Sequence, residues 1–268
     1  TPELKKYQAE VGSTEGILYL TDPVTSGEIL RFNAIHSMSP RSLPAEALID
    51  KLREIPAPSG TLIGGAAADY TDTQQGIADA LPWALLWISV SVLLLLFIFT
   101  GSILLPIKAV LLNILSLAAT LGVITWIFID GNLANLLGGF TVTGTLDTGS
   151  VILIAVTTFG LSMDYEVFLL SRIKEEYEAG KSNSDAVAVG LQKSARIITA
   201  AAVLLAVVFA AFITSGVTSI KTMGFGVALA VILDATIVRA LLVPALMRLF
   251  GERNWWAPKW MQRFTITH

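Results

Sequence analysis

Long runs without charged residues occupy the chain after residue 79. Asp, Glu, Lys and Arg are all missing from four segments: 80–107, 109–129, 148–163 and 197–220. A bilayer core of about 30 Å is crossed by about 20 helical residues, so the first, second and fourth segments are long enough to span it. The third reaches this length only if it continues through Asp164 to about Ser171. A fifth apolar segment, from about 222 to 247, has to include Asp234 and Arg239.

These runs predict a membrane α-helical bundle of five transmembrane helices within residues 80–249. The expected spans lie at about 82–102, 106–129, 150–171, 197–218 and 222–247. The composition agrees, because 54% of the residues are hydrophobic and 15% are charged, whereas about 25% are charged in a soluble domain.

Basic residues predict the orientation of the bundle. The loop 172–196 holds five Lys and Arg residues, and the loop 130–149 holds none. Basic loops are usually cytosolic. We therefore expect residues 1–79 outside the membrane and the tail 250–268 in the cytosol, in a plasma (inner) membrane protein.

Residues 1–79 predict a small α/β unit. The stretch 28–36 is strand-like, 43–55 carries apolar residues at helical spacing, and 61–67 follows a PAPSG turn as a second strand. A βαβ unit of this kind is half of a ferredoxin-like fold. The unit has few aromatic residues for its core, and the chain begins with a polar stretch at Thr1 and not with Met. We therefore expect it to pack against sequence from a longer precursor.

Several kinds of site are not expected. The chain has no cysteine, and its two histidines, His36 and His268, are far apart, so neither a disulfide nor a zinc site is predicted. The net charge of -3 comes without a basic patch, which argues against nucleic acid binding. A GK[ST] phosphate loop is missing, which argues against ATP hydrolysis. We expect no metal and no cofactor.

Asp164 is the most informative residue. It lies in the stretch GLSMDYEVFLLSRIKEEYEAG, residues 160–180, about 4.5 Å from the midpoint of its span at 1.5 Å per residue. A charged Asp at this depth costs about 3 kcal/mol, and such residues normally face a protein interior or a water path. Asp164 is therefore a candidate for carrying protons, and the alternative is an acid paired with a buried base for packing specificity.

The neighbours of Asp164 extend this candidate site. Tyr165 has a hydroxyl that can relay a proton or bond an acid on a facing helix, although it can also be an interfacial aromatic residue. Phe168 lies one turn from Asp164 on the same face, where its ring can gate water. Glu166 points to nearly the opposite side, and we expect it at a solvated helix end.

Asp234 and Arg239 form a second polar pair inside a span. Five residues on an α-helix leave them about 140° from eclipsed, so we expect each to find a partner elsewhere, and a structural salt bridge remains an alternative role. Small residues such as Ser162 and Gly226 are expected to mark close helix packing. Ser184 or Asp185 is expected to cap the helix that follows Gly180.

Three stretches together carry a resemblance to a known family. The segment GLSMDYEVFLLSRIKEEYEAG, the later LDATIVRALLVPALMRLFG and the closing NWWAPKW resemble the MmpL family of actinobacterial lipid exporters, in the resistance-nodulation-division superfamily. The resemblance covers about residues 80–260 and, more loosely, the outer unit. It implies spans 8 to 12 of a twelve-span transporter and a porter subdomain fragment, with the N-terminal half (spans 1 to 7) as partner.

The resemblance also implies roles for the polar residues. Asp164 and Tyr165 match one of two Asp-Tyr pairs in the family's proton relay, and Phe168 matches the ring that closes it. Asp234 and Arg239 match a polar pair in the last span. The implied protein is a secondary transporter and not an enzyme, in which protons drive export of a hydrophobic lipid such as trehalose monomycolate.

Two other functions stay open at this point. An intramembrane aspartyl hydrolase would use Asp164 and Asp234 as a dyad, which requires the two carboxyl groups to share a proton. Another relative in the same superfamily, of the protein-translocation or sterol-sensing type, would be distinguished by the outer domain.

Overall fold

The computed structural model describes residues 2–142 and 144–258. It divides into two compact units, the first ending at Ala84 and the second beginning at Leu85. The helix α3, Ala66–Thr100, contributes residues to both units.

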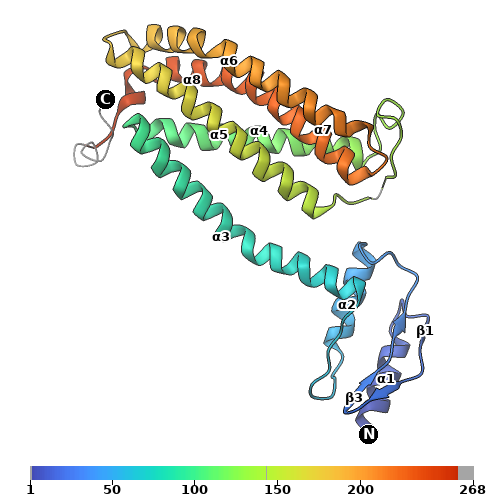
Figure 1. Ribbon diagram of the computed structural model, residues 1–268. Coiled ribbons are helices and arrows are strands. Elements are labelled where there is room, and N and C mark those ends of the chain that lie inside the picture. The colour runs from blue at the N-terminus through green and yellow to red at the C-terminus, as the bar shows by residue number, and fades with distance from the viewer. Residues whose placement is uncertain (1, 143, 259–268) are drawn as a thin grey trace. The chain divides into compact units, whose positions relative to one another are not determined.

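The first unit combines helices with short antiparallel strands. Its elements before α3 are α1 (Pro2–Ser13), β1 (Tyr19–Leu20), β2 (Val24–Ser26), β3 (Ile29–Arg31), β4 (Ala34–Ile35) and α2 (Leu43–Glu54). The strands form two antiparallel pairs, β2 with β3 and β1 with β4. In the sequence, the β2–β3 hairpin lies between β1 and β4 (Figure 1).

Helix α2 confirms the helix predicted at 43–55. The Ser42 side chain accepts a hydrogen bond from the backbone of Ala45 at 3.4 Å, which is the usual cap of a helix start. The apolar face of α2 consists of Leu48, Ile49 and Leu52. It is buried in one cluster with Tyr7 and Val11 of α1. This cluster is the core of the first unit.

The strands expected in this unit are only partly correct. The stretch 28–36 forms β3 and β4 with a break between them, and the strand expected at 61–67 is not formed. Gly65 has a φ of 109°, and three alanines follow it, so the strong helix propensity of Ala starts α3 there. Because no strand follows α2 in the described range, the predicted βαβ order is wrong; α1 was not predicted.

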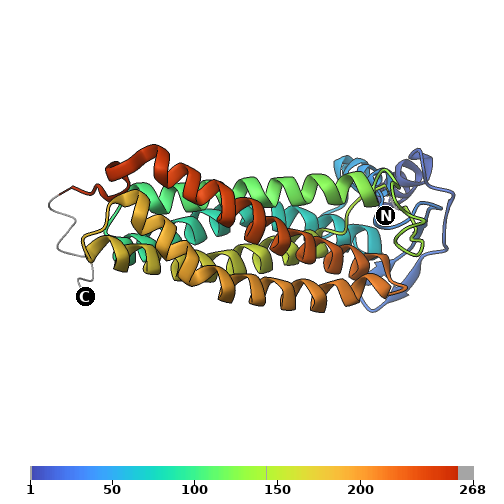
Figure 2. The same ribbon diagram turned by 90° about the horizontal axis from the view of Figure 1, so that it is seen from above.

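The second unit is a helical bundle. Its further elements are α4 (Leu104–Phe128), α5 (Thr148–Glu178), α6 (Asn183–Ala211), η1 (Phe212–Thr214), α7 (Thr218–Leu233), η2 (Asp234–Leu242), α8 (Val243–Phe250) and η3 (Gly251–Trp255). Within the described residues, five helical runs are long and apolar enough to cross a membrane, which confirms the predicted number. Figures 1 and 2 show α4, α5, α6 and the continuous run from α7 to α8 lying side by side.

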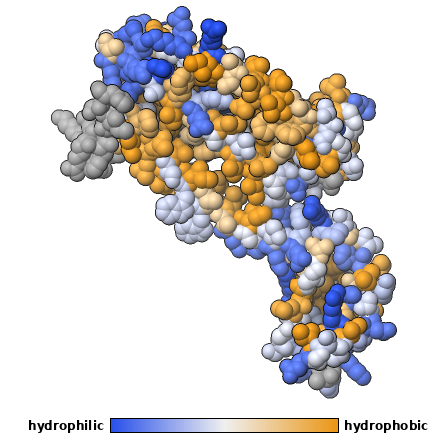
Figure 3. All heavy atoms as spheres, viewed as in Figure 1, coloured by the Kyte–Doolittle hydropathy of each residue, from blue (hydrophilic) through white to orange (hydrophobic). Residues whose placement is uncertain are grey.

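The last span is the central one. In the last span, 50% of the residues in its apolar 18-residue stretch are buried inside the protein. In the corresponding stretch of α3, 11% are buried. The last span consists of α7, η2 and α8. Apolar side chains dominate the face of the bundle that Figure 3 shows. Leu204 and Val207 of α6 are among the exposed apolar residues of the bundle, as expected for helices that face lipid.

Polar caps set the ends of α5 and α6. The Asp147 carboxylate accepts hydrogen bonds from the backbone and the hydroxyl of Ser150, both at 2.9 Å. Ser182 caps α6, accepting from the backbone of Asp185 at 3.2 Å. The cap predicted at Ser184 or Asp185 is therefore wrong by two or three positions, because the chain leaves α5 at Gly180 and turns at once into α6.

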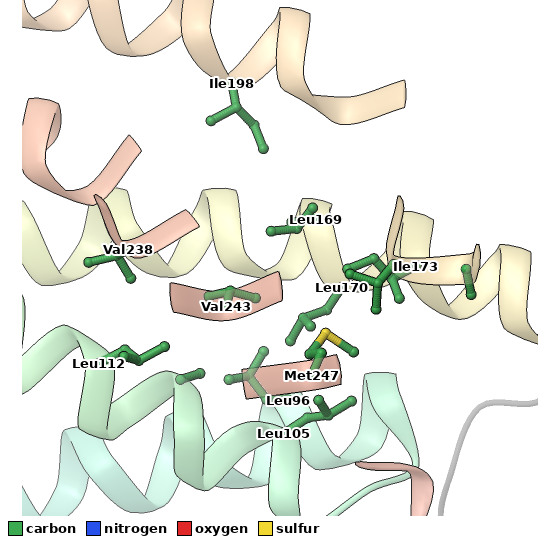
Figure 4. Close-up of a cluster of buried hydrophobic side chains, with 13 residues drawn as sticks. Leu96, Leu105, Leu112, Leu169, Leu170, Ile173, Ile198, Val238, Val243 and Met247 are labelled. Carbon is green, nitrogen blue, oxygen red and sulfur yellow. The ribbon is translucent and has the colours of Figure 1, made fainter. Parts of the chain in front are cut away.

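Apolar side chains fill one end of the bundle. Leu169, Leu170 and Ile173 of α5 pack in one cluster with Val243 and Met247 of the last span (Figure 4). The chain after the last span is fixed at this end: the ring of Trp255 stacks on Tyr177 with 4.3 Å between centroids. From residue 259 on, the predicted tail 250–268 lies outside the described residues.

Candidate functional site

The polar pair of the last span lies in a π-helical segment. Asp234 and Arg239 are the first and sixth residues of η2, and a π-helix has i→i+5 hydrogen bonds, which brings residues five apart to the same face. The Nε of Arg239 donates to Oδ2 of Asp234 at 2.8 Å. The expectation that these residues do not pair is therefore wrong, because it assumed α-helical geometry.

This ion pair is almost fully removed from solvent. Arg239 is 1% exposed and Asp234 is 3% exposed. Burial of two charges is tolerated only when hydrogen bonds satisfy the remaining polar atoms. Ser162 of α5 supplies part of them: its Oγ donates to Oδ1 of Asp234 at 2.9 Å, and its backbone oxygen accepts from Arg239.

Asn113 of α4 completes the network. Its Oδ1 lies within hydrogen-bonding distance of Ser162 Oγ. A hydroxyl has one proton, so Ser162 donates either to Asn113 or to Asp234 at any one time. The network thus joins three helices, α4, α5 and η2, and its hydroxyl proton has two alternative acceptors.

Tyr165 is next to this network. The guanidinium carbon of Arg239 lies 5.0 Å from the centre of the Tyr165 ring, within the range of a cation–π interaction. One guanidinium nitrogen, Nη1 of Arg239, is buried and has no hydrogen-bond partner among the described residues.

Asp164 lies on another face of α5. It is exposed, as are Leu153, Val156 and Gly160, and the spacing of three to four residues places these four on one stripe of the helix. A Cβ added at Gly160 would meet nothing within 4 Å. We call these four residues the open stripe; it brings a carboxyl group to a helix face that the described residues leave uncovered.

Phe168 is half-buried. It packs against the apolar cluster of Figure 4, and the guanidinium carbon of Arg172 lies 5.5 Å from the centre of its ring. The structure therefore brings Tyr165 to Arg239, whereas Asp164 lies on the open stripe, and Phe168 lies between an apolar cluster and the Arg172 guanidinium.

Glu166 was expected at a solvated helix end and is in fact buried, with 5% of its surface exposed. It lines a small cavity together with Lys108 of α4. Its distance of four residues from Ser162 is the signal that could have found it, because that spacing puts both side chains on one face of α5. Asn113, Ser162 and Lys108 were also missed as functional candidates.

The geometry contradicts the aspartyl hydrolase. Oδ2 of Asp234 accepts a hydrogen bond from Arg239, and Oδ1 lies 2.9 Å from the hydroxyl of Ser162. Asp164 is exposed on the open stripe, and no hydrogen bond joins the two acids in the described part of the chain. They do not form a dyad that shares a proton.

Comparison with known proteins decides the family. The model of the MMPL family matches residues 43–265. The chain belongs to the MMPL family. It is thus a multi-pass membrane protein, as the five apolar helices indicate.

Three relatives illustrate the similarity. A membrane protein of Streptomyces coelicolor is 45% identical over 82% of this chain and 31% of its own length. The trehalose monomycolate exporter MmpL3 of Mycobacterium tuberculosis is 42% identical over 82% of this chain and 24% of its own length. The mycolic acid-containing lipids exporter MmpL11 of Mycolicibacterium smegmatis is 34% identical over 98% of the chain and 28% of its own length. The chain spans between about a quarter and a third of these relatives.

Proposed function

We propose that this chain is the C-terminal membrane part of a proton-driven lipid exporter, in which Asp164 and Tyr165 form half of the proton relay. The substrate class is a hydrophobic lipid such as trehalose monomycolate, because named relatives export this lipid or mycolic acid-containing lipids. Residues 1–79 face the outside of the plasma membrane and the tail faces the cytosol. The protein acts as a secondary transporter and not as an enzyme.

The position of Asp164 on the open stripe carries this proposal. A charged Asp facing hydrocarbon costs about 3 kcal/mol, so the stripe requires a cover that offers polar groups. Gly160, one turn away, leaves space for a helix to approach closely. The relatives have three to four times the matched length, which supports a partner for this stripe; in this proposal it is the N-terminal half, spans 1 to 7, with its own acid and hydroxyl facing Asp164.

Tyr165 connects this acid to the interior. It follows Asp164 in sequence, and its ring lies over the guanidinium of Arg239. A change in the charge of Asp164 therefore alters the field at the buried ion pair, whose helix is the centre of the bundle. In this proposal, protonation is coupled to movement through the last span.

The test is Asp164→Asn in the complete transporter, reconstituted in proteoliposomes with a pH-sensitive dye inside. The amide keeps the shape and removes the titrating proton, so proton-coupled lipid export should fall to background while the thermal unfolding midpoint stays near wild type. The matched control is Glu175→Gln, on the same helix, whose carboxylate is 56% exposed and which should export normally. Export by Asp164→Asn at the wild-type rate would show that the acid carries no proton.

A further inference from the structure

The buried side of α5 has its own polar residues. Thr158, Ser162 and Glu166 are all buried, and their spacing of four places them on one face of the helix. On α4, Asn113 and Ser116 are buried and lie three residues apart on one face. These faces meet, because Ser162 bonds Asn113.

The two helices run in opposite directions, since they are consecutive spans. Moving from the Ser162–Asn113 contact toward the loop between the helices, the next polar residue on α5 is Thr158 and on α4 is Ser116. We call the following six residues the polar column: Asn113, Ser116, Thr158, Ser162, Asp234 and Arg239. It lies inside the bundle, on a face of α5 different from that of the open stripe.

Three atoms of the polar column have no hydrogen-bond partner among the described residues. They are Oγ of Ser116, Oγ1 of Thr158 and Nη1 of Arg239, and all are buried. A hydroxyl in a helix can bond the carbonyl four residues before it, as Thr120 does with Ser116, but Ser116 and Thr158 do not. An unsatisfied buried polar group costs about 1–3 kcal/mol, and buried water with several polar partners is the usual way to satisfy it.

One end of the polar column reaches a cavity. Glu166, one turn beyond Ser162, lines this cavity with Lys108, and the walls are Leu112, Leu170 and Met247. The cavity offers about 10 Å³ to the centre of a water-sized sphere, which is about the space of one water molecule. The carboxyl of Glu166 accepts no hydrogen bond from the described residues; the charges that act on it are those of Arg239, Asp234 and Lys108.

The other end is closed by apolar side chains. One cluster there contains three fully buried residues, Ile124, Ile154 and Val227. We call these three residues the apolar seal. Gly226 of α7 permits this contact, since a Cβ at its position would lie 2.7 Å from Ile124 and 2.8 Å from Ile154. A region packed this tightly leaves no room for water.

We propose that the polar column is a hydrated half-channel that opens past Glu166 to the end of the bundle where the tail lies, and that it conducts protons between that side and the relay. This inference rests on the proposed function and its topology, which place that end in the cytosol. Tyr165, between Asp164 and Arg239, is the link to the relay. Glu166 takes a proton from a water of the column and returns it to a water at the mouth, so that its carboxylate is restored after each transfer.

Water access can be measured with cysteine substitutions, because this chain has no native cysteine. Ser116→Cys and Thr158→Cys are placed in the complete transporter, with any cysteines elsewhere replaced, and Ag⁺ is applied to inside-out and right-side-out vesicles. Both should react about tenfold faster from the cytosolic side, a barrier difference of about 1.4 kcal/mol. The control is Ile124→Cys, in the apolar seal, which should react slowly from both sides.

Two results would overturn the half-channel. Reaction of Ser116→Cys and Thr158→Cys as slow as that of Ile124→Cys would mean that the column is dry, and faster reaction from the outer side would reverse its direction. Labelling does not depend on transport, so the two proposals can fail separately. If Asp164→Asn exports normally but the column still reacts from the cytosolic side, the proposed function is refuted and the hydration of the column is not.

The role of Glu166 has a separate test. Glu166→Gln should reduce the rate of proton-coupled export, and Glu166→Asp should restore most of it, because a shorter carboxylate still transfers protons whereas the isosteric amide does not. A wild-type rate in Glu166→Gln would show that Glu166 transfers no proton; equal losses in Gln and Asp variants would indicate a packing role.

Discussion

The buried ion pair between Asp234 and Arg239 should dominate the stability of the last span. Asp234→Asn removes the charge that balances a guanidinium with 1% exposure. Breaking a buried pair by removing one partner costs about 3–5 kcal/mol. The Tyr165 ring, 5.0 Å from the guanidinium carbon, still stabilises the cation by about 0.5–2 kcal/mol. The expected loss of unfolding free energy is therefore about 1–4.5 kcal/mol.

Arg239→Gln should cost a similar amount, because it leaves the Asp234 carboxylate buried with Ser162 as its only remaining bonded neighbour of those observed. The double variant Asp234→Asn, Arg239→Gln removes both charges and keeps side chains that can bond each other and Ser162. It should lose less than the sum of the single variants, with a coupling of at least about 1 kcal/mol.

An exposed pair of the same length provides the control. Arg172 and Glu175 are 2.8 Å apart, the same distance as in the Asp234–Arg239 pair. The side chains of Arg172 and Glu175 are, however, 43% and 56% exposed. Exposed pairs contribute about 0–1 kcal/mol, so Glu175→Gln should change little. The measurement is the midpoint of unfolding of the purified complete transporter in mixed detergent micelles. Single variants of the buried pair that lose under about 1 kcal/mol, or a double variant that loses the full sum, would refute this reasoning.

Two further predictions concern packing and orientation. Gly190→Ala should lower the unfolding free energy by about 1–3 kcal/mol, because the added Cβ would lie 2.8 Å from the backbone Cα of Ile173. The control is Gly122→Ala, whose Cβ would meet nothing within 4 Å and which should be neutral in the same unfolding assay. Thr141→Cys should react with an impermeant thiol reagent on intact cells and Ser184→Cys should not, since basic loops are usually cytosolic; the opposite pattern would invert the topology. Ser184 is chosen because Ser182 caps α6.

The five spans could be predicted because they depend on composition alone. A run of about 20 uncharged residues has one common solution in lipid, a helix, whatever its neighbours are. Short strands have no such signal: β1 and β4 have two residues each, and their pairing depends on a turn and a partner strand. The strand expected at 61–67 failed because helix propensity after Gly65 outweighed a weak alternation.

The orientation of side chains within a span could not be predicted from spacing. On α5, the helical repeat states that Asp164 and Glu166 point to nearly opposite sides, but it does not state which side faces the bundle. For Asp164 the prediction named a protein interior or a water path, and for Glu166 it named a solvated helix end; the structure has Glu166 buried and Asp164 exposed on the open stripe. The choice depends on which helices pack against α5, and that information lies in other segments.

The Asp234–Arg239 pair failed for a different reason. Its residues were identified correctly, but their spacing was evaluated with 100° per residue, and the segment is a π-helix. Such segments are rare and occur often at functional sites, so a polar pair five residues apart inside a span is itself a reason to consider one.

Helix α5 presents two kinds of acid to two different surroundings. Asp164 lies on the open stripe, where the proposed partner half would cover it, and Glu166 lies beside the polar column, where the cavity admits one water molecule. Tyr165 separates them in sequence and contacts the buried ion pair. In the proposed mechanism, a proton that leaves Asp164 has to cross only the width of one helix to reach the column, and the apolar seal at Ile124 and Ile154 would prevent its return to the outer side by the same path. In that mechanism, directional flow requires no second gate among the described residues, since the seal is fixed by packing and the switch lies in the proposed cover of the open stripe.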